Sequence, residues 1–488
     1  MNFMTMQDFI VVLPMLALFA VSLIPIMIKV ITGNREPNPV STLMYSFIGL
    51  IIAIGLTAAL AGGKKMAFAD ALVLDGISVW SSCLVYILAG AGLMLSYDHV
   101  ATRGNQFSEF SFLLLSSCIG MVILIMANDL IITFIGIETM SLCLYIIIAM
   151  SKEDTLAKEA AFKYFVLGSF ASAIFLYGVA LIWGTAGTTY FPALAEQTTK
   201  LLGTNRVFLA GMGMVILGFG FKVSLFPLHC WTPDVYQGAP TPVTAFMSTA
   251  VKAASFVAFL RLFNSEAFSH ATHLYSLMMW LAALTMLIGN VAAIMQDNLK
   301  RMLAYSSVAH SGYAMVGLIA AGFGGNPNAA TTSLLFYLFS YAIMTIGSFA
   351  LVAVFEKHEN TVMTVNDLKG LASKYPVLAL SLSVLLLSLA GVPPTLGFFS
   401  KFYLFSAAVE QDMYWLALWG VINSVISVVY YLRPIVMMYM SDGEPAEVMK
   451  SHMLTRAAVV FSAILIVVLG VCSSPLLKIV QRSVLNLF

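Results

Sequence analysis

Charged residues are scarce in this chain of 488 residues. Only 10% of the residues are Asp, Glu, Lys or Arg, whereas 60% are hydrophobic, and a soluble domain carries about 25% charged residues. The hydrophobic residues are enough for about fourteen membrane spans of about 20 residues each. The composition therefore excludes a soluble enzyme and a nucleic-acid-binding protein. It predicts a single transmembrane domain, residues 1–488, whose main surroundings are the lipid bilayer.

Clustered cysteines and an excess of charge of either sign are also missing. The 24 basic and 23 acidic residues nearly balance, so no global field favours an acidic or a basic partner. The five cysteines are scattered and include no C-x-x-C pair, which argues against an iron–sulfur or zinc site that is local in sequence. Nucleotide, haem and flavin motifs are absent as well. The sequence thus predicts no metal and no cofactor bound by this chain.

The hydrophobic runs predict an all-α polytopic fold with about fourteen spans. The spans are expected at residues 9–31, 40–62, 78–97, 109–127, 129–150, 160–184, 206–226, 240–263, 273–296, 301–323, 330–355, 376–411, 412–438 and 453–473. The seventh span runs into Pro227, and the twelfth contains Pro393 and Pro394. Because proline interrupts a helix, we expect helices 7 and 12 to be broken.

The two predicted breaks divide the chain regularly. Five spans run from the fourth to the eighth and five from the ninth to the thirteenth, and the break is fourth in each set. Adjacent repeats with an odd number of spans must have inverted topology, which is common in transporters. We predict three N-terminal helices (1–108), a first five-helix repeat (109–263), a second one (273–438) and a C-terminal helix (453–488).

Basic residues in the loops predict the orientation. With an even number of spans, both termini lie on the same side of the membrane. The loops on the opposite side hold 13 Lys and Arg residues, against 7 on the side of the termini. Because cytoplasmic loops are enriched in Lys and Arg, we expect both termini on the non-cytoplasmic side.

Apart from charged residues assigned to the loops and the span ends, five ionisable residues fall within the predicted spans, namely Glu138, Lys163, Lys222, Lys252 and Lys401. A charged residue at the centre of a membrane helix costs roughly 2.5–3.5 kcal/mol, so these groups must face the interior and be paired, hydrated or neutral. Structural ion pairs alone do not explain them, because four lysines against one glutamate leave an excess of positive charge. A row of buried lysines linked by water is typical of a proton relay.

Two of these lysines lie close to the predicted breaks. Lys222 is five residues before Pro227, and Lys401 is seven residues after Pro394. Interrupted helices at membrane depth line water-filled cavities, so released backbone carbonyls and water should surround both lysines. The alternative is a packing kink with an incidental lysine, but its occurrence in both repeats favours transport.

Other candidates each have a competing structural explanation. Lys163 belongs either to the relay or to a side chain that extends toward the end of its helix. Lys300 either joins the relay or, together with Arg301, caps the tenth span. His229, after the first break, and His310, in the tenth span, are either proton carriers or satisfied structural histidines.

Several motifs resemble a known family. Residues 221–242 (FKVSLFPLHCWTPDVYQGAPTP), 298–307 (NLKRMLAYSS) and 391–403 (GVPPTLGFFSKFY) resemble the antiporter-like subunits of respiratory NADH–quinone oxidoreductase, complex I. Residues 163–169 (KYFVLGS) and 234–240 (DVYQGAP) are more narrowly similar to the subunit N branch of the bacterial enzyme. The resemblance extends from about residue 75 to about residue 435 and agrees with the length of the chain.

The resemblance implies a fourteen-helix fold with a central hydrophilic axis. Glu138 and Lys222 would form a switchable ion pair, Lys252 would connect the halves, and Lys401 would lead to the exit. Sister subunits often have a histidine in the eleventh span, where this chain has Tyr337, Ser340 and Tyr341, so water, hydroxyls or Lys300 must provide the link. The predicted relay comprises Glu138, Lys163, Lys222, Lys252, Lys300, Lys401 and His229.

The function implied by the resemblance is proton translocation in the membrane arm of complex I, in the bacterial plasma (inner) membrane. The chain would be a non-redox subunit of this translocase, within a hetero-oligomer of membrane-arm subunits. FMN, iron–sulfur clusters and quinone are implied for partner subunits and not for this chain. Alternatives are a subunit of a multisubunit cation/proton antiporter, a subunit of a membrane-bound hydrogenase-type complex, and a structural spacer. Co-purifying flavin and NADH–quinone activity would favour complex I, whereas nickel would favour a hydrogenase.

Overall fold

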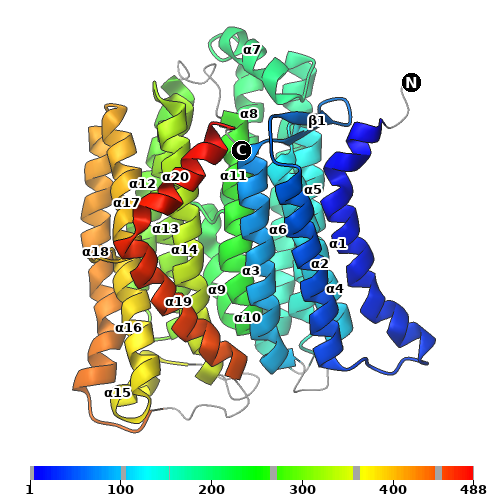
Figure 1. Ribbon diagram of the computed structural model, residues 1–488. Coiled ribbons are helices and arrows are strands. Elements are labelled where there is room, and N and C mark those ends of the chain that lie inside the picture. Colours follow the sequence, from blue (N-terminus) through cyan, green and yellow to red (C-terminus); the bar gives the residue numbers. More distant parts are fainter. Residues whose placement is uncertain are drawn as a thin grey trace.

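The computed structural model describes residues 5–100, 106–152, 154–263, 272–355, 363–445 and 453–486. Nearly all of its regular structure is helical, and eleven helices of the described residues are long and apolar enough to cross a membrane. The long helices run side by side, and the first helix starts at the same end of the bundle at which the last one finishes (Figure 1). We call this end the terminal end. The predicted all-α polytopic fold is confirmed, while the count of fourteen spans stays a prediction.

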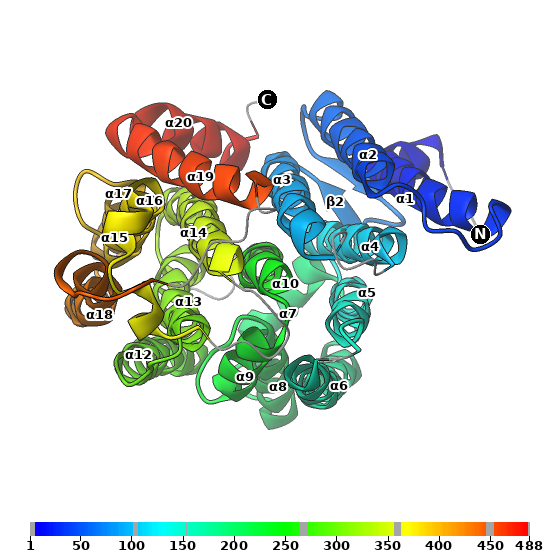
Figure 2. The same ribbon diagram turned by 90° about the horizontal axis from the view of Figure 1, so that it is seen from below.

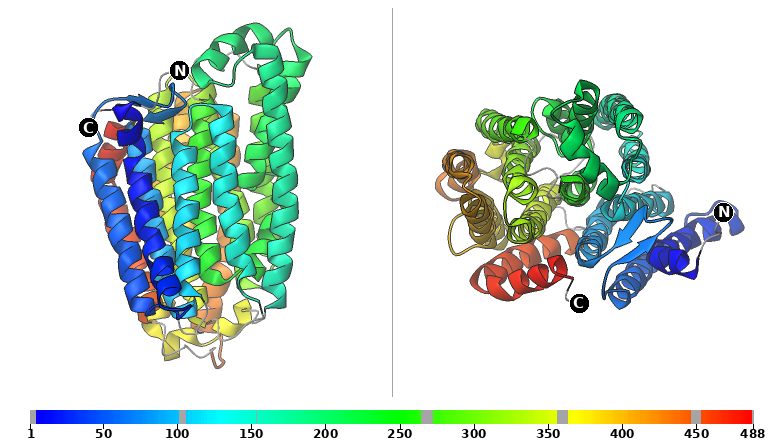
Figure 3. Two further views of the ribbon diagram at one scale, coloured as in Figure 1. Left: turned by 90° about the vertical axis from the view of Figure 1, so that its right-hand side faces the viewer. Right: turned by 90° about the horizontal axis from the view of Figure 1, so that it is seen from above.

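The N-terminal elements form one flank of the bundle. They are α1 (Met6–Ile31), α2 (Pro39–Ala59), β1 (Lys65–Ala67), β2 (Leu72–Leu74) and α3 (Gly76–Val100). The two short strands pair antiparallel and form a hairpin at the terminal end (Figure 3). This pairing satisfies the backbone groups of a connection that would otherwise leave them exposed.

The first predicted repeat contains a broken helix and one element that the sequence analysis did not predict. Its elements are α4 (Phe107–Met126), α5 (Leu130–Ala149), α6 (Thr155–Ala186), α7 (Phe191–Leu201), α8 (Arg206–Lys222), η2 (Leu228–Cys230), α9 (Trp231–Gly238), α10 (Thr241–Phe246), η3 (Met247–Val251) and α11 (Lys252–Phe263). The additional element is α7, which lies at the terminal end (Figure 1). It has only 11 residues, too few to cross a bilayer.

The first break lies between α8 and α9, as predicted. After Lys222 the chain turns at Ser224, whose φ is 62°. The Thr232 hydroxyl donates to the Ser224 hydroxyl at 2.7 Å, and Trp231 Nε1 donates to the carbonyl of Phe221 at 3.0 Å. These bonds satisfy backbone and side-chain groups that the interruption of the helix exposes, which makes a break at membrane depth tolerable.

The second predicted repeat contains the second break. Its elements are α12 (Thr272–Ile294), α13 (Leu299–Phe323), α14 (Pro327–Phe355), η5 (Val365–Leu368), α15 (Leu371–Lys374), α16 (Pro376–Ala390), α17 (Leu396–Glu410) and α18 (Tyr414–Met440). The predicted twelfth span is thus two half-helices. Gly391 ends α16 with a φ of 92°, which favours glycine. A Cβ at this position would also lie 3.2 Å from the side chain of Lys401.

The C-terminal elements α19 (Met453–Val471) and α20 (Ser473–Val484) lie against α3, α14 and α16. Seen from the other end, α10 and α14 lie inside a ring of other helices (Figure 2). Burial agrees with this placement, because every residue of Thr241–Phe263 except Arg261 is buried, and α14 is buried from Ala330 onward except at Phe339 and Ile343. The segment that contains Lys252 is therefore at the centre of the protein.

Several helices begin a few residues earlier than predicted, and side-chain caps account for two of these differences. α6 starts at Thr155 and not at residue 160, because the Asp154 side chain accepts hydrogen bonds from the first backbone amides of the helix. α13 starts at Leu299 and not at residue 301, because Asn298 caps it in the same way. Lys300 therefore lies inside a helix. Three basic loop residues used to predict the orientation, Arg103, Lys357 and Lys450, lie outside the described residues.

Candidate functional site

Glu138 and Lys222 are held by separate hydroxyl groups. Glu138 is half-buried on α5 and accepts a hydrogen bond from Ser172 of α6. Lys222, at the end of α8, is buried and donates from Nζ to Ser141 Oγ at 2.8 Å. Ser141 follows Glu138 by three residues on α5, so both face the same side of that helix. In the described part of the chain no ion pair within 4 Å joins Glu138 to Lys222, so the switchable pair stays a prediction.

Aromatic rings enclose the amino group of Lys222. Its Nζ lies 5.9 Å from the ring centre of Tyr145, 5.8 Å from that of Tyr164 and 5.5 Å from that of Phe221. Trp231 stacks on Tyr164 with 4.7 Å between the ring centres. Cation–π contact stabilises a desolvated ammonium by about 2 kcal/mol or more. The rings therefore surround the amino group of this buried lysine.

Lys252 connects the two predicted repeats. It follows the π-helix η3 directly and is buried, and π-helical turns are frequent at functional sites. Its Nζ donates to the Ser307 carbonyl at 2.6 Å, to the Ser307 hydroxyl at 2.5 Å and to the Ser311 hydroxyl at 2.8 Å. Tyr341 also donates to the Ser307 hydroxyl, at 2.8 Å. The three donors of the ammonium group are thus satisfied by neutral oxygens.

A buried polar chain continues from this point along α13. His310 Nδ1 lies 2.7 Å from the Tyr337 hydroxyl, and His310 Nε2 lies 3.1 Å from that of Tyr431. Tyr431 is also hydrogen-bonded to Ser306, and the Tyr313 ring lies 5.5 Å from the His310 ring. The sequence analysis left water, hydroxyls or Lys300 as the link between Lys252 and Lys401. In the structure, hydroxyl groups and one imidazole lie between these two lysines.

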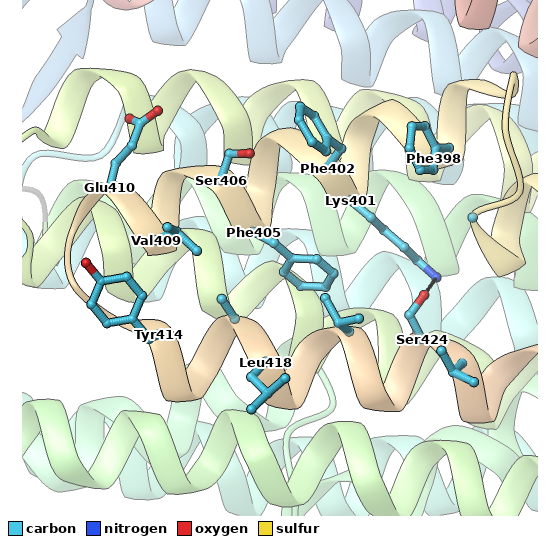
Figure 4. A pocket seen from close by; sticks show the side chains of 14 residues that line it. Phe398, Lys401, Phe402, Phe405, Ser406, Val409, Glu410, Tyr414, Leu418 and Ser424 are labelled. Carbon is cyan, nitrogen blue, oxygen red and sulfur yellow. Dashed lines mark hydrogen bonds between the residues drawn. The ribbon is translucent and has the colours of Figure 1, made fainter.

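Lys401 lies at one end of a cavity of about 720 Å³ between α17 and α18. Its Nζ donates to the Ala390 carbonyl at 3.0 Å and to Ser424 Oγ at 2.9 Å, and it lies 4.9 Å from the Tyr313 ring centre. Figure 4 shows Lys401 and Ser424 at one end of the cavity and Glu410 with Tyr414 at the other. The Ala390 carbonyl is one that the second break releases, as the sequence analysis expected. Between these ends the lining is mainly apolar, and it includes Phe402, Phe405, Val409, Leu418 and Val421.

Lys163 is less deeply placed than the sequence suggested. Its side chain is 38% exposed and forms ion pairs with Glu159 at 2.7 Å and with Asp234 at 2.8 Å. Its charge is therefore compensated, and the predicted excess of positive charge was too large. The sequence analysis overlooked Asp234 because this residue follows Pro233 in the interrupted region and lies in no apolar run.

Two other predicted residues are Lys300, two turns before Ser307 on α13, and His229 on η2. Lys300 is buried and donates from Nζ to the Ala239 carbonyl at 2.8 Å. His229 is buried on η2, and its Nδ1 has no hydrogen-bond partner within the described ranges. The structure thus gathers Lys252, His310 and Lys401 along one route, and it joins His229 to no relay lysine by a hydrogen bond.

The residues that the sequence analysis missed are mostly small hydroxyl side chains. They are Ser141, Ser172, Ser307, Ser311 and Ser424. A serine in an apolar helix carries no signal of its own, because it usually bonds the preceding turn of its own helix. Only the spatial approach of a lysine or glutamate reveals its role. No group of three or more His, Cys, Asp or Glu side chains that could hold a metal occurs in the ranges that the structure describes.

Broken helices, buried lysines and a central polar chain together define a polytopic membrane protein built for ion translocation. Comparison with known proteins agrees with this class. Residues 127–427 match the family described as NADH:quinone oxidoreductase/Mrp antiporter, transmembrane. A NADH-quinone oxidoreductase subunit N of Bdellovibrio bacteriovorus is 51% identical over 98% of this chain and 99% of its own length. That of Rhodospirillum rubrum is 38% identical over 94% of each chain.

Solved structures give the same result. A chain of respiratory complex I from Thermus thermophilus superimposes with a TM-score of 0.80 and 30% identity, covering 95% of this chain and 98% of that one. A chain of the Mrp complex from Dietzia gives 0.80 with 18% identity, covering 99% and 98%, so this likeness shows the fold alone. The chain belongs to the NADH:quinone oxidoreductase/Mrp antiporter family and, within it, to the NADH-quinone oxidoreductase subunit N family.

Proposed function

We propose that this chain is a proton-translocating membrane-arm subunit of NADH-quinone oxidoreductase. Partner subunits carry FMN, the iron–sulfur clusters and quinone, and this chain is a non-redox subunit of the translocase. The observation that carries the proposal is the buried route of Lys252, His310 and Lys401, with Lys222 at the other break. A spacer would have no reason to bury these groups, which are expensive inside a membrane.

The proposed proton path starts at Lys222 and ends at Lys401. Lys222 holds a proton inside its aromatic enclosure, and approach of Glu138 strengthens this hold. When partner subunits alter the charge near Glu138, the proton leaves Lys222 for Lys252. From Lys252 it passes along the hydroxyls and the imidazole of His310 to Lys401, whose cavity leads it out. Each transfer needs donor and acceptor within hydrogen-bond reach, directly or through one water.

The test uses the native assembly in sealed membrane vesicles. Lys222→Ala and Glu138→Gln variants should lower NADH-driven proton uptake per assembled complex by about tenfold or more. NADH oxidation with an artificial acceptor that bypasses the membrane arm reports the amount of assembled enzyme. Full proton uptake in both variants would contradict the proposal. Sodium-dependent exchange without any NADH activity would favour a cation/proton antiporter instead.

We further propose that both ends of the chain lie on the non-cytoplasmic side of the bacterial inner membrane. The support is the excess of basic residues in the loops of the other side. An epitope tag after Phe488 should be accessible to antibody in right-side-out vesicles and protected in inside-out vesicles. The reverse pattern would contradict this orientation.

A further inference from the structure

A cluster of four charged side chains lies at the end of the bundle opposite the terminal end. Asp234, on α9, pairs through Oδ2 with Lys163 of α6 at 2.8 Å and through Oδ1 with Arg301 of α13 at 2.6 Å. Glu159 pairs with the same lysine at 2.7 Å. Figure 2 shows α9 next to both α6 and α13 at this end. Asp234 thus joins the two predicted repeats through one carboxylate.

The end of α9 also contacts Lys300, the residue before Arg301. The carbonyl of Ala239, just after α9, accepts the hydrogen bond of Lys300 at 2.8 Å. Gln237, on the last turn of α9, accepts a second bond from Arg301 at 3.0 Å. The carboxyl end of a helix is partially negative. Two consecutive basic residues of the second repeat thus bind α9. Lys300 bonds to the backbone at its end, and Arg301 bonds to its side chains.

A small polar cavity lies against this junction. It measures about 130 Å³ and is lined by Glu159, Lys163, Asp234, Gln237 and Arg301, among others. It is large enough for several water molecules, and its polar groups could hold them. Lys300, in contrast, is buried. The junction thus lies where a water-accessible charge cluster meets a buried lysine.

Stability alone is a weak reason for these ion pairs. The side chains of Lys163, Asp234 and Arg301 are 38%, 34% and 29% exposed, and partly exposed ion pairs contribute little to stability. Their geometric effect is stronger, because a carboxylate shared by two cations from different helices fixes all three helices relative to each other. The position of the Ala239 carbonyl, and with it that of Lys300, follows from this fixation.

We propose that Asp234 is a positioning residue that holds the end of α9 against α13, so that Lys300 stays aligned with the buried relay. This inference rests on the proposed function and adds a residue to it. Asp234 itself transfers no proton in this account. It acts through Arg301 and the Ala239 carbonyl on Lys300.

The test compares Asp234→Asn with Lys300→Ala and with the double variant in the native complex. Asp234→Asn keeps the size of the side chain but removes the charge that two cations share. NADH-driven proton uptake per assembled complex should fall by about three- to tenfold. The double variant should be no slower than Lys300→Ala alone, because Asp234 acts through that lysine. Asp234→Glu should recover part of the rate.

Asp297→Asn is the matched control. Asp297 precedes α13 and pairs with Arg433, so the substitution also removes a paired carboxylate, and proton uptake should stay unchanged. The inference is overturned if Asp234→Asn behaves like this control, or if it slows the Lys300→Ala variant as much as it slows the native chain. Lys222→Ala in the same preparation separates the two hypotheses. If it leaves proton uptake intact, the proposed function itself fails.

Discussion

The two helix breaks carry the same residue, a lysine, in opposite surroundings. At the first break the carbonyl of Phe221 accepts hydrogen bonds from Trp231 Nε1 and from the Ser224 amide, and Lys222 donates instead to the Ser141 hydroxyl. At the second break the released carbonyl of Ala390 bonds directly to Lys401, together with Ser424. One lysine is enclosed by rings, and the other borders a cavity of about 720 Å³.

The two lysines therefore differ in their surroundings, and this difference suggests different roles in the proposed relay. Lys222 is buried, and the rings of Tyr145, Tyr164 and Phe221 lie within 6 Å of its Nζ. Beside Lys401 the cavity extends toward Glu410 and Tyr414, where α17 meets α18 (Figure 4). We therefore infer that the first break is the retaining site and the second the releasing site of the proposed relay.

Among the substitutions that compare the surroundings of the two breaks, the largest effect is expected from loss of the hydroxyl at the first break. Ser141→Ala removes the hydrogen-bond acceptor of Lys222. A hydrogen bond to a charged group contributes about 1.5–3 kcal/mol, so the proton affinity of Lys222 should fall and proton uptake should drop by about tenfold. Uptake in sealed vesicles, normalised to assembled complex, measures this. Ser172→Ala, which affects Glu138 instead, shows whether the loss depends on the lysine side of the pair. An unchanged rate of proton uptake in Ser141→Ala would contradict the assignment of the first break as the retaining site.

A medium effect is expected from filling the cavity at the second break. Val421 lines this cavity, and Val421→Phe should narrow the cavity beside Lys401 and lower proton uptake by about threefold. Val429→Phe is the matched control, because Val429 lies two turns further along α18, is 58% exposed and is not among the residues that line the cavity. Equal rates in the two variants would show that the cavity is not part of the release route.

A smaller effect is expected from loss of the hydroxyl at the second break. Ser424→Ala leaves Lys401 with the Ala390 carbonyl, which no side-chain substitution removes. Proton uptake should therefore change by less than about twofold, since the remaining bond keeps the ammonium in place. The comparison of this variant with Ser141→Ala, measured in parallel, is the relevant quantity. A larger loss in Ser424→Ala than in Ser141→Ala would reverse the proposed assignment.

The smallest effect on proton uptake is expected from an ion pair remote from both breaks. Asp75 accepts hydrogen bonds from Arg261 at 2.6 and 3.0 Å and from Ser78, and both charged side chains are nearly buried. Asp75→Asn should leave the two breaks unchanged but destabilise the protein by about 3 kcal/mol, because the charge of Arg261 loses its partner. Thermal unfolding in detergent measures this. Asp297→Asn, at an exposed pair, should lower stability by less than about 1 kcal/mol.

The same carboxyl group predicts a pH dependence of stability. Burial alone would raise the pKa of Asp75, but the charge of Arg261 and the hydrogen bonds of Arg261 and Ser78 outweigh it and hold this pKa below its ordinary value of 3.8. A lowered pKa in the folded state stabilises the protein above the ordinary value, and this contribution is lost as the pH falls through the folded pKa. The difference in unfolding temperature between the native chain and Asp75→Asn should therefore be constant near neutral pH and shrink below about pH 4. A difference that grows on acidification would contradict this.

The sequence predicted the parts of the fold that depend on composition and on proline. The runs of apolar residues located the spans, and Pro227, Pro393 and Pro394 located both breaks, because proline disfavours a continuous helix. Proline alone does not decide this, since Pro14 and Pro25 lie inside α1 and Pro434 lies inside α18. The predicted start of α6 was five residues late and α7 was not predicted. A capping aspartate and a short amphipathic helix have little effect on the hydropathy from which the spans were predicted. Boundaries follow local capping more than composition.

The candidate site was predictable in its ionisable members and not in their surroundings. Lys222, Lys252 and Lys401 stand out because charge is costly in an apolar run. Their partners could not be found in this way, because Ser141 and Ser307 resemble any other helical serine and because their contacts join residues 81 and 55 positions apart in the chain. The asymmetry between the breaks depends on such contacts and therefore emerges only in three dimensions.

Lys252 offers the most direct test of the account, because it lies between the retaining and the releasing site and bonds across both predicted repeats. Lys252→Met keeps an unbranched side chain that is one atom shorter and removes the titratable amino group. The measurement is the initial rate of NADH-driven proton uptake per assembled complex in sealed vesicles. We expect this rate of proton uptake to fall by about tenfold or more. NADH oxidation with an artificial acceptor that bypasses the membrane arm should stay normal. A rate equal to that of the native chain would contradict the claim that protons cross this subunit from Lys222 to Lys401.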